Sequence, residues 1–131
     1  MRLRLFAGAA LIMVLLAACS DSGAERTNGV ITGAGNLSVH DLRPGDCLDR
    51  PDKDSEEIDK VKGVPCDEKH AEEIFAKIIY TGGDAYPDAK AMEKYATARC
   101  EAAYRPYVGI DYNASKLLLT YLAPSQDGWE K

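Results

Sequence analysis

The chain has 131 residues, with 16 Lys and Arg against 21 Asp and Glu, and so carries a formal net charge of −5. This length suffices for one small domain and not for two. The acidic balance gives no electrostatic support to nucleic-acid binding, which relies on clustered Lys and Arg. We therefore expect no nucleic-acid partner.

The N-terminus has the layout of a secretory signal. Two arginines precede an apolar run over residues 5–16, which is shorter than the ~20 residues of a membrane-spanning helix. Small residues follow, as at the end of a signal peptide, and "LAAC" at 16–19 resembles a bacterial lipobox. We expect a lipoprotein signal peptide over 1–18 and lipidation of Cys19. Two acyl chains would then hold an extracytoplasmic protein on the cell membrane.

The next segments predict a tether and a polar start to the domain. Residues 19–36 comprise the lipidated cysteine and a stretch rich in Gly and Ser, which is typical of a flexible tether. The folded domain is expected over 37–131. Pro44-Gly45-Asp46 is a turn signal directly before Cys47. Residues 49–60 are mostly charged and predict an exposed loop, since their acids lack the spacing of a calcium-binding loop.

Three later stretches favour strands. "VKGVPC" at 61–66 reads as a short strand that ends at Pro65. Residues 72–80 alternate with period two and predict a longer strand. Its first face holds Ile74, Ala76, Ile78 and Tyr80, and its second holds Phe75, Lys77 and Ile79. Residues 116–122, "KLLLTYL", predict a further strand.

One main helix is predicted, at about 87–105. Pro87 suits its first position, Asp88 favours its positive end, and Pro106 with Gly109 ends it. The expected buried stripe consists of Ala89, Met92, Ala96, Cys100 and Ala103. Ser125 is a possible N-cap of a short second helix. The fold class is therefore α+β, with a small antiparallel sheet and the main helix packed on one face.

The cysteines favour a disulfide staple. With Cys19 assigned to lipid, three cysteines remain in an oxidising compartment, so one of them is left over. Cys47 and Cys66 flank the polar loop, and both follow turn-forming residues. Closing this loop of nineteen residues would stabilise the domain by about 3 kcal/mol. We expect Cys47 to pair with Cys66, which leaves Cys100 on the helix.

The same cysteines, with the histidines, allow two chemical alternatives to the disulfide. The candidate zinc ligands are Cys47, Cys66, His70 and either His40 or Cys100. The paired short spacings of structural zinc sites are missing. A thiol enzyme would pair Cys66 or Cys100 with His70, but the acids at 67–68 disfavour a thiolate at Cys66. We therefore expect no metal and no enzymatic activity.

Four quoted stretches together resemble the bacterial septum-formation domain family. They are "GDC" at 45–47, "VPCDEKHAEEIF" at 64–75, "YPDAKAMEKYATARCEAAYRPYVG" at 86–109 and "LLLTYLAPSQDGW" at 117–129. The resemblance implies a part in division-septum formation. Members of the family are mostly secreted, lipid-anchored or membrane-anchored proteins. It implies no cofactor and no catalytic residues, and Asp46, His70 and Trp129 match its motifs without a known role.

The resemblance also bears on the odd cysteine. Family members typically continue after the tryptophan with a strand that carries another cysteine, and this chain stops at Lys131. We expect the domain to lack its last strand, so that Cys100 either pairs with a missing cysteine or is a buried free thiol.

The leading functional hypothesis is a non-enzymatic, lipid-anchored binding or scaffold module with an unknown cell-envelope or division protein as partner. The alternatives are a cell-envelope thiol or metal-dependent enzyme that uses Cys66 and His70, and a sensory or ligand-binding lipoprotein domain.

Overall fold

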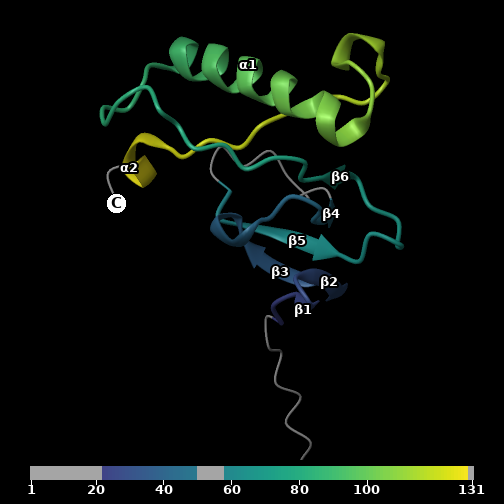
Figure 1. Cartoon of the computed structure of the whole chain (residues 1–131). Helices are drawn as coiled ribbons and strands as arrows, with labels where there is room; N and C mark the ends of the chain where they lie inside the picture. The colour runs from purple at the N-terminus through teal and green to yellow at the C-terminus, as the bar shows by residue number, and fades with distance from the viewer. Residues whose placement is uncertain (1–21, 50–57, 130–131) are drawn as a thin grey trace, which may run out of the picture.

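The computed structural model describes residues 22–49 and 58–129 (Figure 1). In chain order its elements are β1 (Glu25–Thr27), β2 (Val30–Gly33), β3 (Gly35–Ser38), the 3-10 helix η1 (Val39–Asp41), β4 (Cys47–Asp49), β5 (Lys60–Val64), β6 (Glu72–Glu73), α1 (Ala89–Val108), the 3-10 helix η2 (Tyr112–Ala114) and α2 (Gln126–Trp129). The expected signal peptide, Cys19 and most of the expected loop at 49–60 lie outside the described residues. Among the helices of the described part, none is long and apolar enough to span a bilayer.

An N-terminal hairpin corrects the expectation of a tether. β1 and β2 pair antiparallel around Asn28 and Gly29, whose φ angles are 52° and 88°. A two-residue type I′ hairpin turn needs positive φ at both positions, and Asn-Gly is the preferred sequence for it. Ile31 of β2 is 3% exposed. Residues 25–33 therefore belong to the fold, and the Asn28-Gly29 turn is the sequence signal that indicates the hairpin.

The main sheet has four strands in the order β3-β5-β4-β6, all antiparallel. Its central strand β5 confirms the strand predicted at 61–66. The buried apolar core consists of Ile31, Leu37, Leu42, Leu48 and Val61. The hairpin thus contributes directly to the core of the sheet.

Two predicted strands are largely wrong. Of residues 72–80, only Glu72–Glu73 pairs with β4, and Ile74 then exchanges backbone hydrogen bonds with Gly45 and Asp46. The turn before Cys47 carries the neighbouring chain away at this point, so no ladder partner continues. Residues 116–122 begin with a bend at 116–117, have no regular secondary structure, and pair with no strand in the described part of the chain.

The main helix is confirmed, with shifted ends. Asp88 is its N-cap and accepts a hydrogen bond from the Ala91 N–H at 2.8 Å, which satisfies one of the donors left free at a helix start. Pro106 lies inside the last turn rather than after it. The helix ends at Gly109, which has φ 90° and donates its N–H to the Arg105 carbonyl.

Helix α1 packs through aromatic side chains as well as through its small apolar ones. Met92 and Cys100 are buried as predicted, Ala89 is exposed, and Tyr104, which the predicted stripe omitted, is 3% exposed. Figure 1 shows α1 above the sheet, with two extended segments running between them. Tyr104 contacts Phe75 of the first segment edge-on at 5.8 Å. This layering confirms the α+β architecture with one main helix on one face.

The short second helix is also confirmed. α2 follows Ser125, whose hydroxyl accepts a hydrogen bond from the Gly128 N–H at 3.3 Å. This is the geometry of a serine N-cap.

Candidate functional site

The predicted disulfide is present. Cys47 and Cys66 are bonded, and their Cα atoms lie 5.2 Å apart. Cys47 is the first residue of β4 and is 1% exposed, whereas Cys66 is exposed just after β5. The bond therefore joins two neighbouring strands at one end of the sheet. Because both sulfurs are in this bond, neither is available here as a nucleophilic thiolate.

Asp46, beside the disulfide, is buried in an ion pair. Its carboxylate is 3% exposed and accepts hydrogen bonds from both terminal nitrogens of Arg26, at 2.6 and 2.7 Å. The Arg43 N–H donates to the same carboxylate at 2.8 Å. A paired guanidinium and carboxylate of this geometry is among the stronger protein hydrogen-bond arrangements. Asp46 thus fastens the N-terminal hairpin to the turn before Cys47.

The electrostatics of this pair favour the charged form of Asp46. Burial opposes ionisation of the carboxyl group, but the hydrogen bonds from Arg26 and Arg43 outweigh it, and the pKa of Asp46 is lowered. The Asp46 carboxylate in turn raises the pKa of Arg26. Sequence analysis named Asp46 but missed Arg26, because it placed Arg26 in the tether.

His70 lies near the disulfide, in the turn between β5 and β6. Its Nδ1 is 2.9 Å from the Glu68 carbonyl oxygen. One donor atom each of Cys47, His70 and Glu73 lie within 4.8 Å of one another. The sequence had suggested His40 or Cys100 as a fourth ligand, and neither belongs to this cluster.

Glu73 faces Cys47 across the β4–β6 ladder. The Tyr107 hydroxyl of α1 donates a hydrogen bond to Glu73 Oε1. This bond raises the pKa of Tyr107 to about 12, since the carboxylate opposes ionisation of the phenol. The contact ties the end of the main helix to the edge strand. Period-two alternation of the sequence did not reveal this role.

Cys100 is a free, buried cysteine. Burial raises the pKa of its thiol, because a thiolate loses hydration in an apolar environment. It therefore has the properties of a packing residue on α1 rather than those of a reactive nucleophile.

Trp129 belongs to a different part of the molecule. Its ring contacts Tyr80 at 5.1 Å and Tyr86 at 5.6 Å, both edge-on, and its Nε1–H donates to the Asp84 carbonyl at 2.8 Å. Figure 1 places α2 at the left, away from the turn between β5 and β6 at the right. The three motif residues Asp46, His70 and Trp129 therefore do not form one site.

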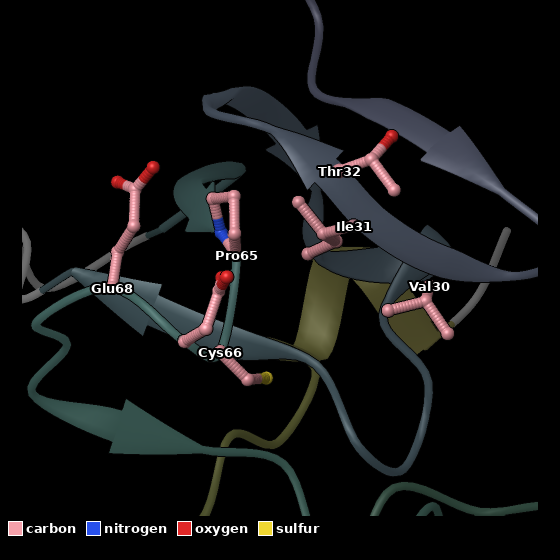
Figure 2. Close-up of a pocket in the computed structure, with 7 residues that line it drawn as sticks. Val30, Ile31, Thr32, Pro65, Cys66 and Glu68 are labelled. Carbon is pink, nitrogen blue, oxygen red and sulfur yellow. The ribbon is translucent and has the colours of Figure 1, made fainter.

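A shallow groove runs between β2 and the turn after β5 (Figure 2). It has a volume of about 470 Å³ and is lined by Val30, Ile31, Thr32, Pro65, Cys66, Asp67 and Glu68. The two acidic residues disfavour anionic ligands, and the lining contains no basic side chain. The groove is open to solvent and holds no converging set of polar groups of the kind that fixes a small ligand.

The segment at 116–122 carries exposed apolar side chains. Leu118 is 93% exposed, Leu117 60% and Leu122 55%. Ile79, on the other extended segment, is 82% exposed. Exposed apolar side chains mark interaction sites on many proteins where they form one contiguous surface.

These features define a small, disulfide-stabilised α+β domain in which two of the three motif residues, Asp46 and Trp129, hold the fold together. A family model described as septum formation matches residues 20–131, and the chain belongs to this septum-formation family. The family predicted from the motifs is thus confirmed. Comparison with curated proteins and with solved structures gave no match.

Proposed function

We propose that this chain is a non-enzymatic, lipid-anchored extracytoplasmic binding or scaffold module that acts in formation of the division septum. The family match over residues 20–131 carries the septal part of the proposal. Its partner is a protein of the cell envelope or the division machinery.

The state of the motif residues supports binding rather than catalysis. The buried Asp46 carboxylate is already paired with Arg26, and the sulfurs of Cys47 and Cys66 are bonded to each other. A general base or a nucleophile must be able to reach substrate in its reactive form. These groups instead stabilise the fold.

The exposed leucines at 116–122 favour a protein partner. Their side chains leave apolar area in water, and covering it with an apolar surface of a partner would be favourable by roughly 25 cal/mol per Å². The segment pairs with no strand in the described part of the chain, so a partner can lie along it. This is the surface through which we expect the scaffold to bind.

The resemblance of residues 16–19 to a lipobox supports the membrane part of the proposal. Only residues 20–24 separate Cys19 from β1. A fully extended chain spans about 3.5 Å per residue, so this link reaches at most about 20 Å. A domain anchored at Cys19 would remain at the membrane surface, where division proteins assemble.

Localisation in dividing cells tests the septal role. A fluorescent fusion of the full chain should concentrate at the septum. The Leu118→Asp variant should lose this enrichment, while Thr120→Asp, a control on the same exposed segment, should keep it. A uniform peripheral signal for the unmodified protein would contradict the septal role, and enrichment of Leu118→Asp would contradict the proposed surface.

The anchor is tested separately. Cys19→Ala should abolish acylation, measured by mass spectrometry of the N-terminal peptide, and should move the protein out of the membrane fraction. Unmodified Cys19 in membranes from cells that express the natural sequence would contradict lipid anchoring.

A further inference from the structure

We propose that Cys47, Cys66, His70 and Glu73 form a zinc site when a dithiol reductant opens the Cys47–Cys66 disulfide. This goes beyond the proposed scaffold function, and each can fail without the other. Metal binding then depends on the redox state. In the oxidised protein the disulfide links Cys47 to Cys66, and in the reduced protein a bound zinc ion links the same two residues.

Three of the four donors already converge. One donor atom each of Cys47, His70 and Glu73 lie within 4.8 Å of one another. Cys66 is the fourth donor. Its sulfur is bonded to that of Cys47 but does not belong to this group, so it must turn toward the other three donors once the disulfide opens. The sheet holds this arrangement in place, since Cys47 of β4 lies directly opposite Glu73 of β6. It also lies opposite Val64 of β5, two residues before Cys66.

Two of the donors are held by neighbouring groups. His70 Nδ1 lies 2.9 Å from the Glu68 carbonyl oxygen. When Nδ1 carries the proton and donates it there, Nε2 presents its lone pair to a metal. Glu73 accepts a hydrogen bond from the Tyr107 hydroxyl at Oε1, which leaves its second oxygen for coordination. Such outer partners orient the ligands of natural zinc sites and are part of their design.

The donor set suits zinc. Two thiolates, an imidazole and a carboxylate are all zinc ligands, with bonds of about 2.3, 2.0 and 2.0–2.2 Å in a tetrahedron. Donor atoms in such a tetrahedron lie roughly 3.3–3.8 Å apart. The sulfurs must therefore separate, and the other donors must draw in by about 1 Å. His70 and Glu73 are at least partly exposed, so the ion can enter from solvent.

Reduction of the disulfide supplies the two thiols that zinc binds. The reductant gives two electrons and two protons to the Cys47–Cys66 bond, which breaks into two thiols while the reductant's own sulfurs join in a disulfide. Zinc then displaces both thiol protons to solvent and binds the two thiolates. Oxidation reverses the sequence and releases the ion, because a disulfide has no thiolate to offer.

Cobalt and zinc titrations test the site. The full chain is prepared in detergent with Cys19→Ala and Cys100→Ala, so that Cys47 and Cys66 are its only thiols. After reduction it should bind one equivalent of Co²⁺ with thiolate-to-metal charge-transfer absorption, and Zn²⁺ should displace the cobalt. The oxidised protein should show neither effect. Reduced protein without charge-transfer absorption would overturn the proposal.

Variants distinguish the folded site from loose coordination by two thiols. His70→Ala and Glu73→Gln should each weaken zinc binding by at least about 10-fold, and Tyr107→Phe by about 10-fold through the lost orientation of Glu73. The control is His40→Ala, which removes the other histidine of the chain and should leave the affinity unchanged.

The two histidine variants remain decisive if reduction loosens the fold. A disordered chain would use either histidine, so equal losses in His40→Ala and His70→Ala would overturn the proposal. Loss confined to His70→Ala would support it.

Discussion

Arg26 and Asp46, twenty positions apart in the chain, form a two-point ion pair with N–O distances of 2.6 and 2.7 Å. The side chains are 16% and 3% exposed. The pair joins β1 to the turn that precedes Cys47. It therefore links the hairpin nearest the expected lipid anchor to the disulfide at the end of the sheet.

Removing the cation should be costly. Arg26→Met leaves the Asp46 carboxylate buried without its main partner, and we expect the free energy of unfolding to fall by about 3 kcal/mol or more. Lys62→Met is the matched control, because Lys62 pairs with Asp49 while both are about half exposed, and its effect should be under about 1 kcal/mol. Urea unfolding measures both. Equal effects would contradict a stabilising role for burial of the Arg26 pair.

Acid should destabilise the domain through Asp46. Its pKa in the folded state is lowered below the value of about 3.9 that applies to the unfolded chain. The stability it contributes is therefore fully present above about pH 4–5, and is lost as the pH falls through the folded pKa. Unfolding free energies measured from pH 7 to pH 2 should show this loss. Asp46→Asn should have a flatter profile over the same range, and an unchanged profile would argue against Asp46 as its source.

Opening the disulfide should weaken the fold. In the chain-entropy account, a cross-link that spans nineteen positions stabilises by about 3 kcal/mol. The double variant Cys47→Ala/Cys66→Ala should lose about this much in chemical denaturation without metal. Cys100→Ala, which breaks no bond, serves as the control and should respond to reductant as the natural sequence does.

Trp129 should report on the docking of α2. Trp129→Ala removes two edge-on ring contacts, each worth about 0.5–1.5 kcal/mol, so we expect a loss of roughly 1–3 kcal/mol. Trp129→Phe keeps a ring there and loses the hydrogen bond to the Asp84 carbonyl, which is worth about 1 kcal/mol. Thermal unfolding compares the two. A Phe variant as unstable as the Ala variant would contradict the importance of the ring contacts.

Truncation of two leucines should have very different effects on stability. Leu48 is 2% exposed and belongs to the core of the sheet, so Leu48→Ala should cost about 2–5 kcal/mol. Leu118 is 93% exposed, and Leu118→Ala should change stability by less than about 0.5 kcal/mol. Urea unfolding of both variants checks this. Strong destabilisation by Leu118→Ala would show that its surface is covered in the folded protein.

Local signals in the sequence were sufficient to predict the Cys47–Cys66 disulfide and the helices. Cys47 and Cys66 flank a polar loop at turn-forming residues, and closing a loop depends mainly on chain length. Asp88 and Ser125 cap helices through contacts within three residues. The four ordered motifs were also specific enough to identify the septum-formation family, which the match over residues 20–131 confirms.

The tertiary structure alone decided what depends on a partner distant in the chain. Residues 72–80 alternate like a strand, but a strand needs a neighbour, and the turn before Cys47 withdraws it after Glu73. Arg26 lies in a segment of tether-like composition and acquires its role only when folding brings Asp46 beside it. In the same way, His70 and Glu73 come together with the disulfide only because antiparallel register places Glu73 opposite Cys47. The sequence determined which local structures could form, while long-range pairing selected among them and assembled the side chains that carry the chemistry.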